Sequence, residues 1–133
     1  MNKRVVAFAV ISIAVGIALG AFGAHGLRRL TTNEDILRGY QTGIDYHLFH
    51  SLAFLLVGVF SSTILKTDFA KKAFGLIVIG IILFAGSLYL LTCFRVMGWS
   101  YTWIGPVTPL GGLLLVLGWS WLGYSFLRTE TAK

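Results

Sequence analysis

The length of the uncharged apolar runs constrains this chain more than any other feature. No Asp, Glu, Lys or Arg interrupts residues 5–24, 48–65 or 73–94, and a last such run covers residues 96–127. The hydrocarbon core of a bilayer is about 30 Å thick and is crossed by roughly 20 residues of helix. Each run is therefore long enough to cross a membrane as an α-helix, and the last is longer than one straight span requires.

The composition agrees with a membrane protein. Hydrophobic residues make up 56% of the 133 residues and charged residues only 12%, with a mean hydropathy of +0.81, whereas a soluble domain carries about 25% charged residues. So few charges cannot cover a water-facing surface, which excludes an ordinary soluble globule and a disordered chain. The net charge of +6 does not indicate nucleic acid, because the basic residues lie between the apolar runs, where they orient membrane proteins. We expect no nucleic-acid partner.

We predict an all-α fold: an integral membrane four-helix transmembrane bundle that forms a single transmembrane domain over residues 1–133. The expected spans are residues 5–24, 47–65, 73–94 and 109–127. The first run follows two basic residues, as in a signal peptide, but it exceeds the usual 7–15 apolar residues. We therefore expect the first helix to be retained.

The sequence allows two starting points for the fourth helix. A proline inside a helix clashes with the carbonyl group four residues earlier, which for Pro109 is that of Gly105. Pro109 either kinks a helix that begins at Ile104 or is the first helical residue after an N-cap at Thr108. We favour the second arrangement, because threonine is a frequent N-cap and proline suits the first helical position.

An even number of spans places both termini on one side of the membrane. That side would hold seven basic residues against four on the other, and the positive-inside rule then places both termini in the cytoplasm. The seven are Lys3, Arg4, Lys66, Lys71, Lys72, Arg128 and Lys133, and the four are Arg28, Arg29, Arg38 and Arg95.

The segment between the first two spans has a helical pattern of its own. The sequence from Thr31 to Glu34 matches a capping box, and acidic residues occupy the following turn. Glu34 and Arg38 are spaced to pair at i,i+4, and Leu30, Leu37 and Ile44 share one stripe. We expect an amphipathic interfacial helix here, which bends into the second span.

Small residues recur on one face of the first span and near the start of the fourth. Such residues let helix backbones approach closely, which drives helix association in lipid. Two partners remain open for these faces: other helices of the same chain, or a second copy in a homo-oligomer. The positions are Ser12, Gly16 and Gly20 in the first span and Gly111, Gly112 and Gly118 in the fourth.

Polar side chains within the spans gather toward the expected outer end. His47 and His50 lie at i,i+3 on a polar-to-small face of the second span, so we expect His50 to point inward toward Ser87 and Tyr89, and His47 to lie nearer the interface. Spans without a central carboxylate lack the usual proton relay, which argues against a common proton-driven antiporter. The candidate ligand-binding residues are His25, Gln41, Asp45, His47, His50, Ser87, Tyr89 and Thr108.

Three interpretations of this polar cluster remain open. The side chains satisfy one another, or they bind a small ligand or lipid, or the histidines hold a metal ion or haem. Histidines at i,i+3 are a weak metal signal when no Cys or Glu completes the set. The chain has no HExxH, Walker, GxSxG or CxxC motif, and we predict no catalytic residue, no metal site and no cofactor.

Four segments resemble a known family. They are GAFGAHGL (20–27), YQTGIDYHLFHSLAFLL (40–56), FAGSLYLL (84–91) and VTPLGGLLLVLGW (107–119). Their order is similar to that in the family called domain of unknown function 423, or UPF0382, which includes bacterial inner-membrane proteins and the vertebrate transmembrane protein 256. The resemblance implies four helices and, for bacterial members, the cytoplasmic membrane, and it implies no activity.

The resemblance also singles out individual positions without giving them roles. These are His25, Gln41, His50, Ser87, Tyr89, Thr108 and Pro109.

The leading functional hypothesis is a non-enzymatic inner-membrane protein, with membrane lipid as a partner. Its polar, histidine-containing pocket near the outer leaflet would bind a small or amphipathic ligand. One alternative is a structural or assembly factor that packs against a larger membrane complex. The other is a metal-, haem- or quinone-binding module.

Overall fold

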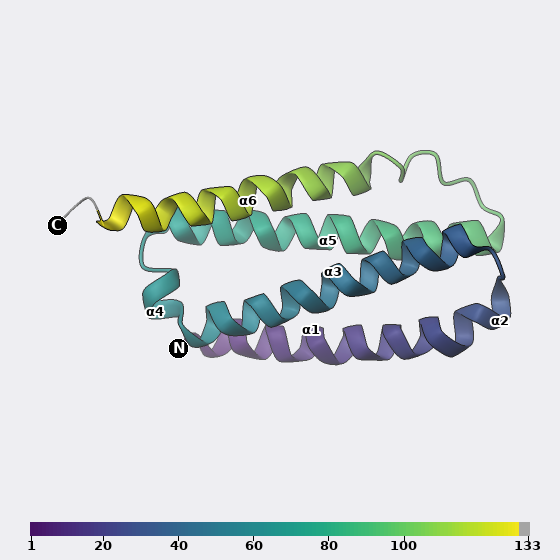
Figure 1. Cartoon of the computed structure of the whole chain (residues 1–133), viewed down its shortest axis with the longest axis horizontal. Coiled ribbons are helices and arrows are strands. Elements are labelled where there is room, and N and C mark those ends of the chain that lie inside the picture. The colour runs from purple at the N-terminus through teal and green to yellow at the C-terminus, as the bar shows by residue number, and fades with distance from the viewer. Residues whose placement is uncertain (131–133) are drawn as a thin grey trace.

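The computed structural model describes residues 1–130, with side chains described up to residue 127. The Arg128 side chain and Lys133, which entered the charge comparison, therefore lie outside the described part. The described residues form helices and no strands. In chain order they are α1 (Lys3–Phe22), the π-helical turn η1 (Gly23–Leu27), α2 (Arg28–Leu30), α3 (Glu34–Val59), α4 (Ser61–Ile64), α5 (Asp68–Met97) and α6 (Val107–Glu130) (Figure 1).

Four of these helical stretches are long and apolar enough to cross a membrane. They are Lys3–Leu30, Glu34–Val59, Asp68–Met97 and Val107–Leu127. The predicted all-α four-helix transmembrane bundle is thus confirmed. Figure 1 shows the described ends of the chain at one end of the bundle, the termini end, while η1 and the connection between α5 and α6 lie at the other, the loop end.

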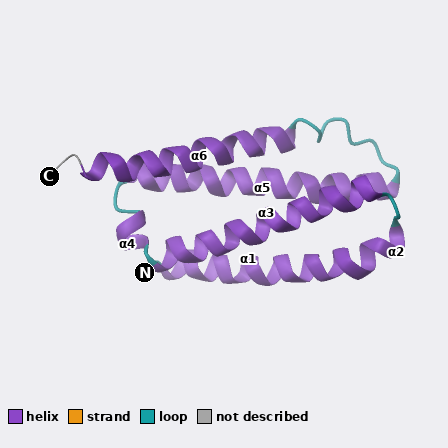
Figure 2. Ribbon diagram, viewed as in Figure 1, coloured by secondary structure: helices purple, strands orange, loops and turns teal. Residues whose placement is uncertain are grey.

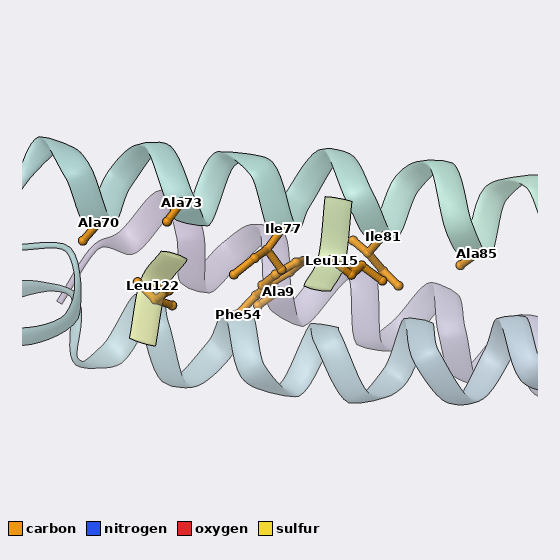
Figure 3. Close-up of a cluster of buried hydrophobic side chains, with 9 residues drawn as sticks. All are labelled: Ala9, Phe54, Ala70, Ala73, Ile77, Ile81, Ala85, Leu115 and Leu122. Carbon is orange, nitrogen blue, oxygen red and sulfur yellow. The ribbon is translucent and has the colours of Figure 1, made fainter. Parts of the chain in front are cut away.

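The four long helices pack mainly in the order in which they occur in the chain. The strongest contacts join α1 to α3, α3 to α5 and α5 to α6, and the ribbons follow the same order (Figure 2). One cluster of buried side chains draws on all four, including Ala9, Phe54, Ile77 and Leu115 (Figure 3). The outward faces of the helices carry many exposed large apolar side chains, as expected where lipid replaces water.

The segment expected to form a separate interfacial helix is the first half of α3. Residues 34–59 form one continuous helix, so a separate interfacial helix is not confirmed. The predicted capping box is wrong, because Asn33 and not Thr31 caps α3: its side-chain oxygen accepts from the backbone N–H groups of Asp35 and Ile36. An asparagine directly before the helix satisfies two of the N–H groups that lack helical partners.

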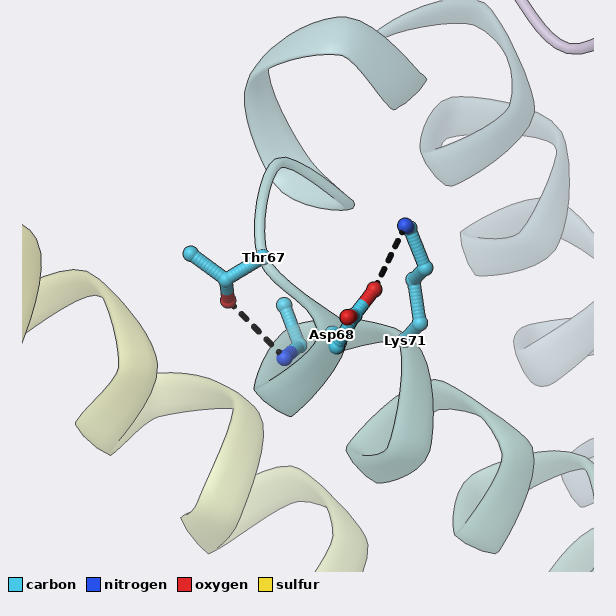
Figure 4. A network of polar contacts seen from close by, with 4 residues as sticks. Thr67, Asp68 and Lys71 are labelled. Atoms are coloured by element: carbon cyan, nitrogen blue, oxygen red, sulfur yellow. Dashed lines mark hydrogen bonds and ion pairs between the residues drawn. The ribbon is translucent and has the colours of Figure 1, made fainter.

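α5 begins at a cap on the termini end. The Thr67 hydroxyl accepts from the backbone N–H of Ala70 at 3.1 Å, and Lys71 forms a 2.8 Å ion pair with Asp68 (Figure 4). The helix ends at Gly98, whose φ of 69° is left-handed and therefore suits glycine.

α6 begins between the two predicted starts. Its first helical residue is Val107, so the N-cap expected at Thr108 is wrong and Thr108 belongs to the first turn. Residues 102–106 form turns, and no kinked helix starts at Ile104. Pro109 remains in the first turn, where its missing N–H would have had no helical partner.

Glycines set the spacing between α5 and α6. A Cβ at Gly111 would lie 2.5 Å from the backbone nitrogen of Phe84, and one at Gly118 would lie 2.6 Å from the Ile77 side chain and 3.1 Å from its backbone nitrogen. Gly112 is less constrained, because its nearest neighbour, the Phe84 ring, would be 3.6 Å away. Gly111 and Gly118 thus permit contact between the two backbones.

The small-residue face of α1 lies against α3. A Cβ at Gly16 would lie 2.5 Å from the end of the Leu48 side chain, whereas one at Gly20 would be 3.7 Å from Ile44. The face therefore meets side chains of the same protein chain, and only Gly16 is closely packed.

Candidate functional site

Four polar side chains from three helices form a connected network around His47 of α3. Its Nε2 lies 2.9 Å from the Ser12 hydroxyl of α1, and its Nδ1 lies 3.0 Å from the Tyr89 hydroxyl of α5. Ser51, one turn further along α3, lies 2.6 Å from the Ser12 hydroxyl and donates to the His47 carbonyl oxygen at 2.8 Å. We call these four side chains the His47 network; it joins α1, α3 and α5.

Counting protons gives the direction of every bond in the His47 network. The single hydroxyl proton of Ser51 goes to a carbonyl oxygen, so Ser12 must donate to Ser51. Ser12 then accepts from His47, which places the imidazole proton on Nε2 and leaves Nδ1 to accept from Tyr89. The bonds run one way, from the Tyr89 hydroxyl to a backbone carbonyl, and use every polar hydrogen of these side chains.

The His47 network borders a cavity of about 200 Å³ between α1, α3 and α5. The rest of its lining is apolar and includes Phe8, Phe54 and Ile81. Because the polar groups are already bonded to one another, this cavity offers a ligand mainly apolar contact.

His50 lies on a different face of α3 and makes different bonds. Its side chain is only 4% exposed. Its Nδ1 lies 2.8 Å from the Tyr46 carbonyl oxygen, and its Nε2 accepts from the Trp119 indole at 3.1 Å. An indole N–H only donates, so the His50 proton sits on Nδ1, the opposite tautomer to that of His47. This neutral ring ties α3 to α6.

A groove of about 840 Å³ lies beside His50, between α3 and α6, and we call it the α3–α6 groove. Its walls are mainly apolar and aromatic, and the carboxylate of Asp45 lies at its loop end. The lining residues are Asp45, Tyr46, Phe49, His50, Phe84, Gly112, Leu115, Val116, Trp119 and Ser120.

The remaining candidate residues form two separate pairs and one isolated side chain. The Gln41 amide donates to Asp45 at 2.7 Å, and the Ser87 hydroxyl lies 2.7 Å from that of Thr108. His25 lies in η1, is exposed, and makes no side-chain hydrogen bond within the described part of the chain. The eight candidate residues therefore do not form one cluster.

The expected orientation of the two histidines is wrong. His47, and not His50, contacts Tyr89, and Ser87 contacts Thr108 instead of a histidine. Residues at i,i+3 differ by about 60° around a helix, and that difference turns His47 toward α1 and α5 but His50 toward α6.

Two partners of the histidines were absent from the candidate ligand residues. Ser12 was expected only to pack helices, although its place on the small-residue face carries it to His47. No polar partner was expected for Trp119. Its position deep in a span could have indicated one, because a buried indole N–H needs an acceptor. Among residues the structure describes, no three His, Cys, Asp or Glu side chains come together as a metal site.

The family described as "Protein of unknown function (DUF423)" matches residues 19–112. The chain belongs to this family. The match covers His47, His50, Ser51 and Tyr89 and the first six residues of α6, whereas Ser12 lies outside it.

Several relatives match most of the chain. A UPF0382 membrane protein of Haemophilus influenzae is 33% identical over 98% of this chain and 99% of its own. The UPF0382 inner membrane protein YgdD of Escherichia coli is 35% identical over 97% and 93%, and a UPF0382 membrane protein of Schizosaccharomyces pombe is 34% identical over 84% and 92%. No solved structure matches the chain. The protein is thus an integral membrane protein of a family whose name assigns no activity.

Proposed function

We propose that this is a non-enzymatic membrane protein that holds an amphipathic ligand in the α3–α6 groove. The observation that carries the proposal is a groove of about 840 Å³ with apolar walls and one carboxylate at its end. Small-molecule sites have volumes of about 300–1,000 Å³ and are mostly apolar, with a few placed polar groups. The α3–α6 groove meets that description better than the smaller cavity at the His47 network.

The charge of the groove selects the chemistry of the ligand head. One oxygen of Asp45 accepts from Gln41, but an ionised carboxylate has about four acceptor positions. The remaining positions favour a cationic or hydrogen-bond-donating head, while the apolar body lies against Phe49, Val116 and Trp119. His50 does not need to touch the ligand, because its bond to Trp119 orders the groove wall.

Native mass spectrometry of protein extracted with its lipids tests the proposal. Val116→Trp places an indole in the groove, whereas Leu113→Trp adds the same ring to an exposed position of α6 outside the groove. We expect the wild type and Leu113→Trp to retain a bound amphiphile and Val116→Trp to lose it. Asp45→Asn should weaken its retention without changing the helical content.

The alternatives have distinct outcomes in the same experiment. A stoichiometric protein partner in place of a small adduct would favour a structural or assembly factor. A bound chromophore would favour a haem or quinone module. Retention of the same adduct by wild type and Val116→Trp, or no adduct in the wild type, would reject the groove as the site.

We also propose that both termini are cytoplasmic. The excess of basic residues at the termini end supports this orientation. Single cysteines at the exposed positions Ser62 and Thr32, in a Cys93→Ser background, should label from opposite sides with an impermeant thiol reagent. Ser62→Cys should react only when the cytoplasmic side is accessible, and the reverse result would invert the orientation.

A homo-oligomer through the small-residue faces stays a prediction. Ser12 and Gly16 lie against α3 of the same chain, and Gly111 and Gly118 lie against α5. A protomer contact would need another face, and the mass of the intact complex in the same spectra measures its stoichiometry.

A further inference from the structure

A further cavity lies at the loop end, next to the part of α3 that precedes the α3–α6 groove. It has a volume of about 330 Å³ and lies between η1 and the first half of α3. We call it the loop-end pocket. Its lining includes Gly23, Leu27 and Tyr40. It is smaller and more polar than the α3–α6 groove.

Two arginines line the loop-end pocket, and neither forms an ion pair within the described part of the chain. Arg28 and Arg38 both line it, as does Glu34. In the described part of the chain the ion pair of Asp68 and Lys71 is the only one, so neither arginine is paired within 4 Å of a carboxylate. The pair expected between Glu34 and Arg38 is not formed. Two arginines and one glutamate leave the lining with a net positive charge, which favours an anion in the pocket.

The π-helical turn η1 sets the direction of Arg28 around the helix axis. A π-turn holds an extra residue, which rotates everything after it by about 100° relative to a regular α-helix. Arg28 follows η1 directly. Tyr40 holds the turn, because its hydroxyl donates to the Leu19 carbonyl at 2.8 Å and its ring fills the space where a Cβ of Gly23 would lie, 2.6 Å away. π-turns occur often at functional sites, and this one directs a charge toward α3.

We propose that the loop-end pocket binds a phosphate ester, held by Arg28 and Arg38. The planar guanidinium fork matches phosphate oxygens in bidentate geometry, and such charge-assisted bonds are stronger than neutral ones. Gln41 also lines the pocket and gives only one amide hydrogen to Asp45, which leaves a second donor for the ligand. The phosphate ester belongs either to a phospholipid headgroup or to a soluble molecule.

The test is a binding titration of the full-length protein in neutral detergent with dihexanoyl phosphatidylglycerol. We expect Arg28→Gln and Arg38→Gln each to weaken binding about tenfold, as the loss of one charge-assisted bond predicts. Arg29→Gln and Arg95→Gln are matched controls, because these arginines lie toward the same end but do not line the pocket. They should change the affinity less than about twofold.

Two further measurements make the result decisive. Glycerol 3-phosphate, titrated alone, distinguishes the two sources of the phosphate ester. If it binds as tightly as the lipid, the phosphate ester is sufficient for binding. If only the lipid binds, the ligand is a phospholipid. Equal losses in all four arginine variants would reduce the site to general charge attraction and overturn the proposal, as would full affinity in Arg28→Gln and Arg38→Gln. Val116→Trp should leave this binding intact, so failure here is separate from failure at the α3–α6 groove.

Discussion

The contact between α5 and α6 and the contact between α1 and α3 join neighbouring spans by different means. Between α5 and α6, Gly111 and Gly118 bring one helix against backbone atoms of the other. Between α1 and α3, Gly16 meets the mobile end of Leu48, and the His47 network supplies the bonds.

The two contacts differ in which atoms can move to make room for an added group. A backbone atom moves only with its helix, whereas the end of a leucine side chain can turn to another rotamer. Apolar helices gain little by leaving lipid for one another, so close packing and hydrogen bonds must hold them together. The α5–α6 contact is held by close packing and tolerates no added volume. The α1–α3 contact relies on hydrogen bonds, and its side chains can move to accept a larger residue.

The largest expected effect is that of Gly111→Ala. Its new Cβ would lie 2.5 Å and 2.8 Å from backbone atoms of Phe84, so the helices must separate, at a cost of about 1–3 kcal/mol in the free energy of unfolding. Gly112→Ala is the adjacent control, with its nearest neighbour 3.6 Å away. Thermal unfolding in detergent measures both. Equal stability of the two variants would show that α5 and α6 are not in backbone contact.

A smaller effect is expected for Gly16→Ala. The clash is with the flexible end of Leu48, and rotation of that side chain should limit the loss to about 1 kcal/mol, the low end for added volume. Gly20→Ala should be nearly neutral, because its Cβ would have 3.7 Å of clearance. Leu48→Ala should rescue Gly16→Ala in the same assay. A loss at Gly16 as large as that at Gly111 would remove the distinction between the two contacts.

The smallest expected effect is that of Tyr89→Phe, which removes the first donor of the His47 network. Side-chain hydrogen bonds in membrane proteins contribute about 0.6 kcal/mol on average and about 1.7 at most. Tyr46→Phe is the control, since the Tyr46 hydroxyl makes no hydrogen bond within the described part of the chain. A double-mutant cycle with Ser12→Ala should show coupling, because both hydroxyls bond the same imidazole. Additive losses would mean that the network does not act as one unit.

The sequence was informative about the position of each helix and the face on which it packs, although it misplaced the caps of α3 and α6 by one or two residues. Uncharged runs of bilayer length identified the four helices that are long and apolar enough to cross a membrane. Small residues marked the faces on which α1 and α6 pack, including Gly16 and Gly111.

It was uninformative wherever the answer depends on how one helix is rotated against another. A helical wheel places His47 and His50 on one polar face, but that face spans the boundary between the α1 and α6 sides of α3. The π-turn after Phe22 was also hidden, because it depends on Tyr40 reaching the Leu19 carbonyl from a different helix. Such contacts carry no local signature in spacing or composition.

The packing order of the helices also bears on how the protein is made. Each long helix after α1 packs against the one that precedes it in the chain: α3 on α1, α5 on α3 and α6 on α5. Contacts between successive elements close short loops and form quickly. A chain that leaves the ribosome one helix at a time can therefore pair each span with one already in the bilayer, and the most tightly packed pair, α5 and α6, completes the bundle last.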